Sequence, residues 1–284
     1  MKETSEVNLL SYAKINLYLR VVGKTGNLHE LDMVNSAISL ADEIRVRFLE
    51  TDELKVTFSD KSIDSETSTV MRAMKLVREI VPFGAEVFVE KRIPSEAGLG
   101  GGSGNASTIL KFLDEELGLR ERGVDVREVG LKVGSDVPCM MDFGFSRASG
   151  VSASVQKIES DLKVWLVLVK GERGVSTGKC FSECRIQNSE FRIIDDLIGA
   201  IRNNDLGGVV RNLRNDLFEP AVSFVSEIRD HIELLKTHGA LTAFMTGSGS
   251  CCVGIFKDEE SARIAEEGLR REGARLWTAV ARTK

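Results

Sequence analysis

Five glycines lie within seven residues, from Gly98 to Gly104, in the stretch IPSEAGLGGGSGNASTIL. Apolar residues at helical spacing follow at once, so a helix is expected to begin behind the glycines, at about residue 105. The first amides of a helix lack partners inside it, and glycines before them let the backbone wrap an anion without a Cβ in the way. The run therefore predicts a phosphate-binding loop, in which Gly101 and Gly102 are expected to adopt positive φ.

The glycine run fits two common nucleotide-binding motifs poorly. No lysine follows the glycines, as it does in the nucleotide loop that ends in Gly-Lys-Ser/Thr, and the dinucleotide motif would need an acidic residue after the next strand. A flexible surface loop is the plain alternative. The run is bounded closely by an apolar strand and an amphipathic helix, which favours phosphate binding over a mobile linker.

Three further residues or turns could take part in chemistry, although none is decisive alone. Asp136 lies in GSDVP, where an aspartate before Val-Pro can simply shape a turn. Lys14 lies between two apolar residues of a strand pattern, where a lysine usually faces solvent. The stretch from Thr246 to Ser250 is a second glycine-rich turn, which by itself could be an ordinary hairpin turn.

The elements that would position these residues can be read from the hydrophobic pattern. Strand patterns lead and helical patterns follow, which predicts a mixed α+β fold. The predicted strands are 15–22, 42–49, 53–59, 85–94 and 163–171. The predicted helices are 68–81, with Val70, Met74, Val77 and Val81 on one face, 105–117, with Ile109, Leu110, Leu113 and Leu117 buried, and the helical stretch 221–240. The C-terminal part, from residue 240, predicts strand, glycine turn, strand, helix and strand, and two domains, 1–150 and 151–284, are expected.

Composition excludes several classes of protein. The chain has 284 residues, 42% of them hydrophobic, which is enough for a large core, and its net charge of −5 with no basic tract argues against a nucleic-acid partner. The N-terminus carries acidic residues instead of an apolar signal, and no run of about eighteen apolar residues occurs. A soluble cytoplasmic protein without a membrane partner is expected. The five cysteines are expected to be reduced thiols, and the oligomeric state stays open.

Three motifs together resemble those of the GHMP small-molecule kinases. SYAKINLYL is similar to the first motif of that family, PSEAGLGGGSGNAS to the second and MTGSGSCC to the third, in the same order along the chain. The resemblance covers most of the chain and implies a two-domain GHMP kinase fold with the active site in the cleft between the domains. It also implies a small-molecule alcohol as substrate, with ATP and Mg²⁺.

The resemblance implies roles for individual residues. Asp136 would accept the proton of the substrate hydroxyl, and Lys14, close to it, would keep it ionised and stabilise the developing oxyanion. Ser103 would offer its hydroxyl to a phosphate or to Mg²⁺. The ATP-binding loop would comprise Pro94, Gly98, Leu99, Gly100, Gly101, Gly102, Ser103 and Gly104. The substrate-binding residues would be Asn16, His29, Phe181, Thr246, Gly247 and Ser248.

The chain departs from the cytidyl-binding members of the family in residues of base recognition. Those members usually have Gly-Tyr-His-Glu after the first motif, whereas this chain reads GNLHEL, with His29 kept and Leu28 in place of the tyrosine. Asn35 stands where a second aromatic residue is found in some members, while Phe181 keeps an aromatic ring. The adenine-side pattern reads STV at 68–70 instead of Asn-Leu-Val.

Three functions therefore remain open at the level of sequence. The first is a kinase that phosphorylates a cytidyl-linked alcohol with an altered base pocket. The second is a GHMP-type kinase that acts on a different small alcohol, and the third is a nucleotide-binding protein without catalysis. The third is disfavoured because Lys14 and Asp136 are both present.

Overall fold

A computed structural model of the chain describes residues 5–26, 28–142, 144–150, 154–184, 192–272 and 275–284. The chain divides into two compact units, each assembled from several segments. The first unit consists of Met1–Ala13, Ala41–Pro94 and Gly100–Asp142, and the second of Lys14–Leu40, Ser95–Leu99 and Phe143–Lys284. The domain division predicted near residue 150 borders on residues 151–153, which lie outside the described part, and it stays a prediction.

The chain contains both helices and strands, interspersed along its length, which agrees with the predicted mixed α+β fold. The strands are β1 (Val7–Thr25), β2 (Leu28–Leu49), β3 (Leu54–Phe58), β4 (Gly84–Glu90), β5 (Phe145–Gly150), β6 (Ser154–Ile158), β7 (Trp165–Lys170), β8 (Arg214–Asn215), β9 (Thr242–Met245), β10 (Cys252–Phe256) and β11 (Trp277–Arg282). The α-helices are α1 (Thr69–Arg78), α2 (Gly101–Leu117), α3 (Val126–Val133), α4 (Thr177–Ser182), α5 (Arg192–Arg202), α6 (Leu206–Arg211), α7 (Phe218–Phe224), α8 (Glu227–Thr237) and α9 (Glu259–Glu272). Two short 3-10 helices are η1 (Arg120–Arg122) and η2 (Pro138–Met140).

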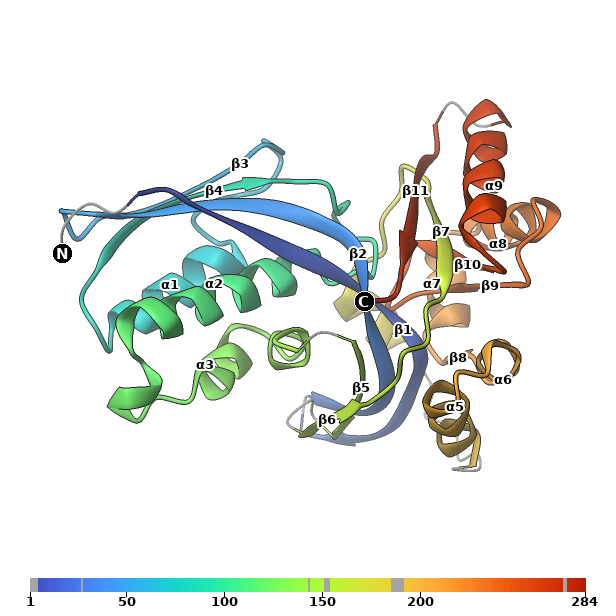
Figure 1. Ribbon diagram of the computed structural model, residues 1–284, viewed down its shortest axis with the longest axis horizontal. Coiled ribbons are helices and arrows are strands. Elements are labelled where there is room, and N and C mark those ends of the chain that lie inside the picture. The colour runs from blue at the N-terminus through green and yellow to red at the C-terminus, as the bar shows by residue number, and fades with distance from the viewer. Residues whose placement is uncertain (1–4, 27, 143, 151–153, 185–191, 273–274) are drawn as a thin grey trace. The chain divides into compact units, whose positions relative to one another are not determined.

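The first unit is a sheet covered by helices. Strand β4 lies between β3, to which it is parallel, and the C-terminal part of β2, to which it is antiparallel. Helices α1 and α2 pack beside each other against this sheet and α3 packs against both (Figure 1). The aromatic rings of Phe48 in β2 and Phe112 in α2 stack at a centroid distance of 5.6 Å, and Phe83 meets Phe48 edge-on at 6.1 Å. Burial of this apolar layer anchors α2, the helix behind the glycine run.

The two predicted helices of the first unit form with shifted ends. In α1 the buried face contains Val70, Met74 and Val77 as predicted, and the helix ends at Arg78, while Val81 lies beyond it, partly buried against the same core. Helix α2 buries the predicted residues and begins at Gly101, four residues before the predicted start.

The second unit contains two sheet regions. Residues 31–36 of β2 pair antiparallel with β5, β5 forms a hairpin with β6, and Tyr18 and Leu19 of β1 pair with the short parallel strand β8. A separate antiparallel sheet has the order β11-β7-β10-β9, with α8 and α9 packed against it (Figure 1). Residues 166–169 of β7, an inner strand of this sheet, are fully buried on both faces of the strand, which agrees with the apolar run predicted within 163–171.

The C-terminal part of the chain follows the predicted order of strand, turn, strand, helix and strand, as β9, β10, α9 and β11. The helical stretch predicted at 221–240 is interrupted between α7 and α8, where Val225 leaves the helical region with φ −135° and ψ 87°. No helix in the described part of the chain is long and apolar enough to cross a membrane.

All five cysteines are free thiols. Burial raises the pKa of the Cys180 and Cys251 thiols to about 12, so both stay protonated and unreactive near neutral pH.

Candidate active site

Two glycine turns of the second unit touch backbone to backbone. Gly98 has φ +71°, and a Cβ on it would lie 2.1 Å from the carbonyl oxygen of Thr246. Gly247 has φ +57°, and a Cβ on it would lie 2.7 Å from the carbonyl oxygen of Gly98. Each turn therefore excludes any side chain from the other, and both positions require glycine for conformation and for space.

Hydrogen bonds of the main chain join three of the predicted stretches in this unit. The amides of Ser250 and Cys251 donate to the carbonyls of Glu96 and Ala97, both at 3.3 Å. The amide of Lys14 donates to the carbonyl of Leu99 at 3.0 Å. The strand that carries Lys14, the start of the glycine run and the turn that begins at Thr246 are thus held together by backbone contacts.

Polar side chains on β1 continue this connection. Lys14 Nζ donates to Asn16 Oδ1, Asn16 Nδ2 donates to Asn35 Oδ1 at 2.6 Å, and the amide of Asn16 donates to Thr246 Oγ1 at 2.9 Å. Lys14 and Asn16 share one face of β1 because strand residues alternate between faces. Thr246 is fully buried and Asn16 is 1% exposed, so these polar groups depend on one another for hydrogen bonding.

Two residues that the sequence analysis did not assign hold the turn at 246–250. Asn215 Nδ2 donates to the carbonyls of Met245 at 2.8 Å and Gly247 at 2.9 Å, and Thr177 Oγ1 is hydrogen-bonded to Ser248 Oγ at 2.9 Å. Asn215 lies within RNDLFEPAV and Thr177 within GVSTGKCF, two stretches that resemble the family but do not single out either residue.

His29 and Phe181 are brought together although they are far apart in sequence. Their rings stack with centroids 5.1 Å apart and an angle of 28° between the ring planes. Phe181 lies in α4 next to the fully buried Cys180, which anchors the helix, while the Phe181 ring is half-buried and keeps accessible surface.

The rest of the glycine run belongs to the first unit, at the start of α2. The N-cap residue is Gly100 with φ 69°, which has no side chain to cap the helix. In contrast, the side chain of Ser68 caps α1 and that of Asp125 caps α3. Positive φ therefore occurs at Gly98 and Gly100, whereas Gly101 and Gly102 are helical, and the expectation of positive φ at those two residues is wrong. The uncapped first amides of α2 are suited to an anion.

A buried carboxylate shapes the chain just before this helix. Asp42 Oδ1 accepts hydrogen bonds from the amides of Arg92 and Ile93, both at 2.8 Å, and Asp42 Oδ2 accepts from Lys91 Nζ. A Cβ on Gly101 would lie 3.0 Å from Ile93 Cγ2. The segment leading to Pro94 is thereby fixed against the first turn of α2, and this role of Asp42 was not predicted.

The first turn of α2 also contacts the start of α1. Thr69 Oγ1 donates to the carbonyl of Gly102 at 2.6 Å, so the STV stretch at 68–70 lies next to the glycine run. A Cβ on Gly104 would lie 3.0 Å from the carbonyl oxygen of Tyr12, so helix and strand approach closely there. Ser103 is half-buried between these two contacts.

No group of three or more His, Cys, Asp or Glu that could hold a metal ion occurs among the described residues. This arrangement is compatible with Mg²⁺, which usually keeps several waters and binds proteins through few side chains together with substrate phosphates. The hydroxyl of Ser103 is one oxygen ligand that the first turn of α2 could supply.

Asp136 lies in a turn between α3 and η2. The amide of Val137 donates to the carbonyl of Gly134 at 3.1 Å, and Val137 is fully buried. Two cationic side chains hold the segment that follows: Arg127 donates to the carbonyl of Pro138 at 3.1 Å, and Lys111 donates to the carbonyl of Met141 at 3.1 Å.

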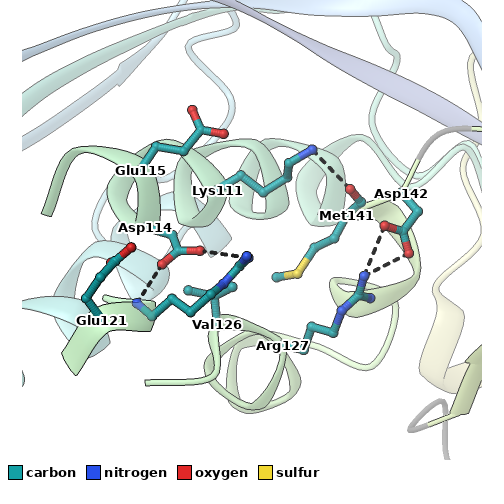
Figure 2. A pocket seen from close by; sticks show the side chains of 9 residues that line it. Lys111, Asp114, Glu115, Glu121, Val126, Arg127, Met141 and Asp142 are labelled. Carbon is teal, nitrogen blue, oxygen red and sulfur yellow. Dashed lines mark hydrogen bonds and ion pairs between the residues drawn. The ribbon is translucent and has the colours of Figure 1, made fainter. Parts of the chain in front are cut away.

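Figure 2 shows these cations at a polar pocket between α2 and α3, with a volume of about 330 Å³. Two ion pairs lie in its lining: Arg127 donates to both carboxylate oxygens of Asp142, at 3.0 and 2.8 Å, and Arg120 pairs with Asp114. None of the predicted site residues lines this pocket, so it is distinct from the predicted site.

The structure thus assembles the predicted residues in three groups. The first group lies in the second unit, where hydrogen bonds and close backbone contacts link Lys14, Asn16, Gly98, Leu99, Thr246 and Gly247, and Ser248 bonds to Thr177. The second group, in the same unit, is the stacked pair of His29 and Phe181. The first unit holds the others, which are Pro94, Gly100, Gly101, Gly102, Ser103, Gly104 and Asp136.

Comparison with known proteins gives matches along most of the chain. The model for the GHMP kinases N terminal domain matches residues 68–146, and the model for the GHMP kinases C terminal region matches residues 197–275. A 4-diphosphocytidyl-2-C-methyl-D-erythritol kinase from Syntrophotalea carbinolica is 32% identical over 281 residues, which are 96% of this chain and 97% of that protein. The chain belongs to the GHMP kinase family.

Solved structures agree with this membership. A crystal structure of 4-(cytidine 5'-diphospho)-2C-methyl-D-erythritol kinase superposes with a TM-score of 0.78 and 26% identity, covering 97% of this chain and 99% of that one. A homoserine kinase from Cytophaga hutchinsonii superposes with a TM-score of 0.75 at 14% identity, covering 100% and 96%. The predicted GHMP kinase fold is confirmed, and the fold alone does not select the alcohol substrate.

Gly98→Ala tests the contact between the two glycine turns. Gly239 is a matched control, because it also has positive φ, +89°, but nothing lies within 4 Å of a Cβ there. Gly239→Ala should lower the free energy of unfolding by about 1–2 kcal/mol, the cost of left-handed backbone for alanine. Gly98→Ala should cost about 1–3 kcal/mol more because of the overlap with Thr246. Denaturant unfolding measures both, and equal losses would contradict the contact.

Arg127→Ala tests the support of the Asp136 segment. Loss of its hydrogen bonds should cost about 1 kcal/mol locally, because the side chain is partly exposed, and exchange of nearby amides should then be about fivefold faster. The amides to follow by hydrogen exchange are those of Val137, Met140 and Met141. Arg120→Ala is the control from the same pocket, since the Arg120 side chain is 82% exposed and pairs with Asp114. If both variants exchange alike, Arg127 does not support the segment.

Proposed function

We propose that this GHMP kinase transfers the γ-phosphoryl group of ATP to the 2-hydroxyl of 4-diphosphocytidyl-2-C-methyl-D-erythritol, in the non-mevalonate synthesis of isoprenoid precursors. The observation that carries the proposal is the similarity to a kinase named for this substrate along nearly the whole of both chains, at 32% identity. A solved kinase of the same name superposes with a higher TM-score than the homoserine kinase does.

The start of α2 is proposed to bind the phosphates of ATP. Its uncapped amides and the partial positive charge of the helix end favour an anion, and the helical glycines let the phosphate approach the backbone. Mg²⁺, when bound with ATP, would neutralise charge on the transferred phosphoryl group. Ser103 is proposed to contact a phosphate or this ion through its hydroxyl, and Pro94 and Leu99 to frame the loop.

Asp136 and Lys14 are proposed to carry the chemistry. The Asp136 carboxylate would accept the proton of the substrate hydroxyl as the phosphoryl group moves to its oxygen, and the turn that holds it is supported by Arg127 through Pro138. The Lys14 ammonium would stabilise the negative charge that develops on the reacting oxygens. Its position is supported by the hydrogen bond to buried Asn16.

His29 and Phe181 are proposed to bind the cytosine. The stacked pair already places a flat aromatic surface next to a hydrogen-bonding ring, and Phe181 is half-buried, so part of its surface is accessible to a base. Asn16 and the turn formed by Thr246, Gly247 and Ser248 are proposed to contact the remainder of the substrate.

A second function is favoured by one observation. Asn35 is hydrogen-bonded to Asn16, and Leu28 replaces the usual tyrosine, so two aromatic contacts expected of a cytidine pocket are missing at these positions. A GHMP-type kinase for a different small alcohol is therefore the alternative. Incubation with Mg-ATP and a panel of 4-diphosphocytidyl-2-C-methyl-D-erythritol, mevalonate, homoserine and galactose, with measurement of ADP release, decides between them.

Asp136→Asn should reduce kcat by at least about a hundredfold and leave nucleotide affinity nearly unchanged, because it removes a general base and not a phosphate contact. Steady-state kinetics and direct titration with ATP measure the two quantities. Asp114→Asn, which removes the charge of another carboxylate in the first unit, serves as the control and should keep normal turnover. Near-normal turnover of Asp136→Asn would exclude the assigned role.

Phe181→Ala should raise KM for the cytidyl substrate about tenfold while KM for ATP barely changes, since base–aromatic stacking is worth about 1–3 kcal/mol. Phe218→Ala is the matched control: Phe218 is also half-buried at a short helix of the second unit, and its ring contacts Arg229. A lower melting temperature with equal changes in both KM values would instead assign Phe181 to the core.

A further inference from the structure

A chain of three buried polar side chains crosses from β1 to β2 in the second unit. Lys14, Asn16 and Asn35 are 8%, 1% and 6% exposed. Lys14 Nζ donates to Asn16 Oδ1, and Asn16 Nδ2 donates to Asn35 Oδ1 at 2.6 Å. The backbone of Asn35 is itself fixed, because β2 pairs with β5 at this residue, opposite Ser146.

The direction of these hydrogen bonds follows from the ammonium group at one end. A lysine ammonium has donors and no acceptor, so Asn16 must turn its oxygen toward Lys14. The other side of the Asn16 amide is then its NH₂ group, which needs an acceptor. Asn35 must therefore present Oδ1 and not Nδ2, and the orientation of both amides is determined by Lys14.

In this arrangement the Oδ1 of Asn35 is the oxygen that accepts a hydrogen bond from the side-chain NH₂ group of Asn16. The other contact of Asn16 Nδ2 within the described residues is Met33 Sδ at 3.5 Å, and a thioether is a weak acceptor. Without the Asn35 oxygen, the buried NH₂ group would lose its strong partner. The Asn16 amide could then rotate, and its oxygen would no longer be held in place for Lys14.

We propose that Asn35 is a positioning residue, which acts on Lys14 through Asn16 and keeps the ammonium group where phosphoryl transfer needs it. The inference rests on the proposed function, since the role of Lys14 is assigned there. Some relatives have an aromatic residue at the position of Asn35. In this protein an acceptor oxygen, and not an apolar ring, completes the row of buried hydrogen bonds.

Two substitutions separate the acceptor from the volume of the side chain. Asn35→Leu keeps a similar size and removes the acceptor, and it should lower kcat about tenfold while KM for ATP stays within about twofold, because misplacement of a catalytic group affects turnover. Asn35→Asp keeps an acceptor oxygen and should restore most of the lost turnover. Ser36→Ala is the control, since it removes a buried hydroxyl of the same strand that bonds to Ala37, and neighbouring strand residues such as Asn35 and Ser36 point to opposite faces.

A double-mutant cycle tests whether Asn16 and Asn35 act as one unit. If they do, Asn16→Ala with Asn35→Ala should lower kcat no more than Asn16→Ala alone, because residues that act together are not additive. Additive losses, wild-type kcat in Asn35→Leu, or a lower melting temperature with no rescue by Asn35→Asp would each overturn the proposal.

A measurement without substrate keeps this test separate from the proposed function. With ¹⁵N-labelled asparagine, the side-chain NH₂ of Asn16 should exchange slowly in the wild type and in Asn35→Asp, and at least about tenfold faster in Asn35→Leu. If the wild type phosphorylates no cytidyl compound and this exchange pattern is still found, the substrate assignment fails while the orientation of Asn16 by Asn35 stands. Unchanged exchange in Asn35→Leu would reject the inference whatever the activity.

Discussion

The contact between two glycine turns is the constraint on which the candidate site depends. Gly98 and the turn at 246–249 lie so close that a Cβ on Gly98 would be 2.1 Å from a carbonyl oxygen of the other turn. A packed interior cannot absorb such an overlap by small shifts, so the two turns keep their places only as long as neither carries a side chain. The bonds of Lys14 to Leu99 and of Asn16 to Thr246 then attach β1 to the same point. Contacts of the main chain thus determine where the site residues of the second unit lie, and side-chain hydrogen bonds add to this.

Buried polar groups provide the second level of organisation. Asp42 takes bonds from two amides and an ammonium group, and in doing so it turns the chain toward the start of α2. Asn16, which is also buried, does the same for β1, and the half-buried Asn215 holds the turn after β9. Asp42 and Asn16 would be costly to bury alone, so their partners are obligatory and the local backbone has one satisfied arrangement. This arrangement leaves the first amides of α2 without a capping side chain from Gly100.

Much of the fold could be predicted from periodicity, because β4, β7 and the buried faces of α1 and α2 follow from alternation and helical spacing. The start of α2 could not be predicted in this way, since glycine has a low helix propensity. Gly101 and Gly104 belong to the helix because they pack closely against neighbouring segments. The family and the glycine loop were recognisable from three local motifs. The hydrogen bonds of Asn35, Thr177 and Asn215 could not be predicted, because their partners lie elsewhere in the chain. The pairing of His29 with Phe181 depends in the same way on tertiary structure.

The division of the chain between the units has a consequence for synthesis on the ribosome. All segments of the first unit precede residue 143, whereas the second unit needs segments from residue 14 up to β11, whose strand pairs with β7. Contacts such as that of Asn16 with Thr246 join residues 230 positions apart, and such non-local contacts form late and slowly. A nascent chain can therefore complete the first unit while the backbone amide of Asn16 still lacks its late partner, Thr246. Chaperones would meet this protein chiefly through its unfinished second unit, and a prematurely terminated chain would present folded helices α1 to α3 with no assembled turn beside Lys14.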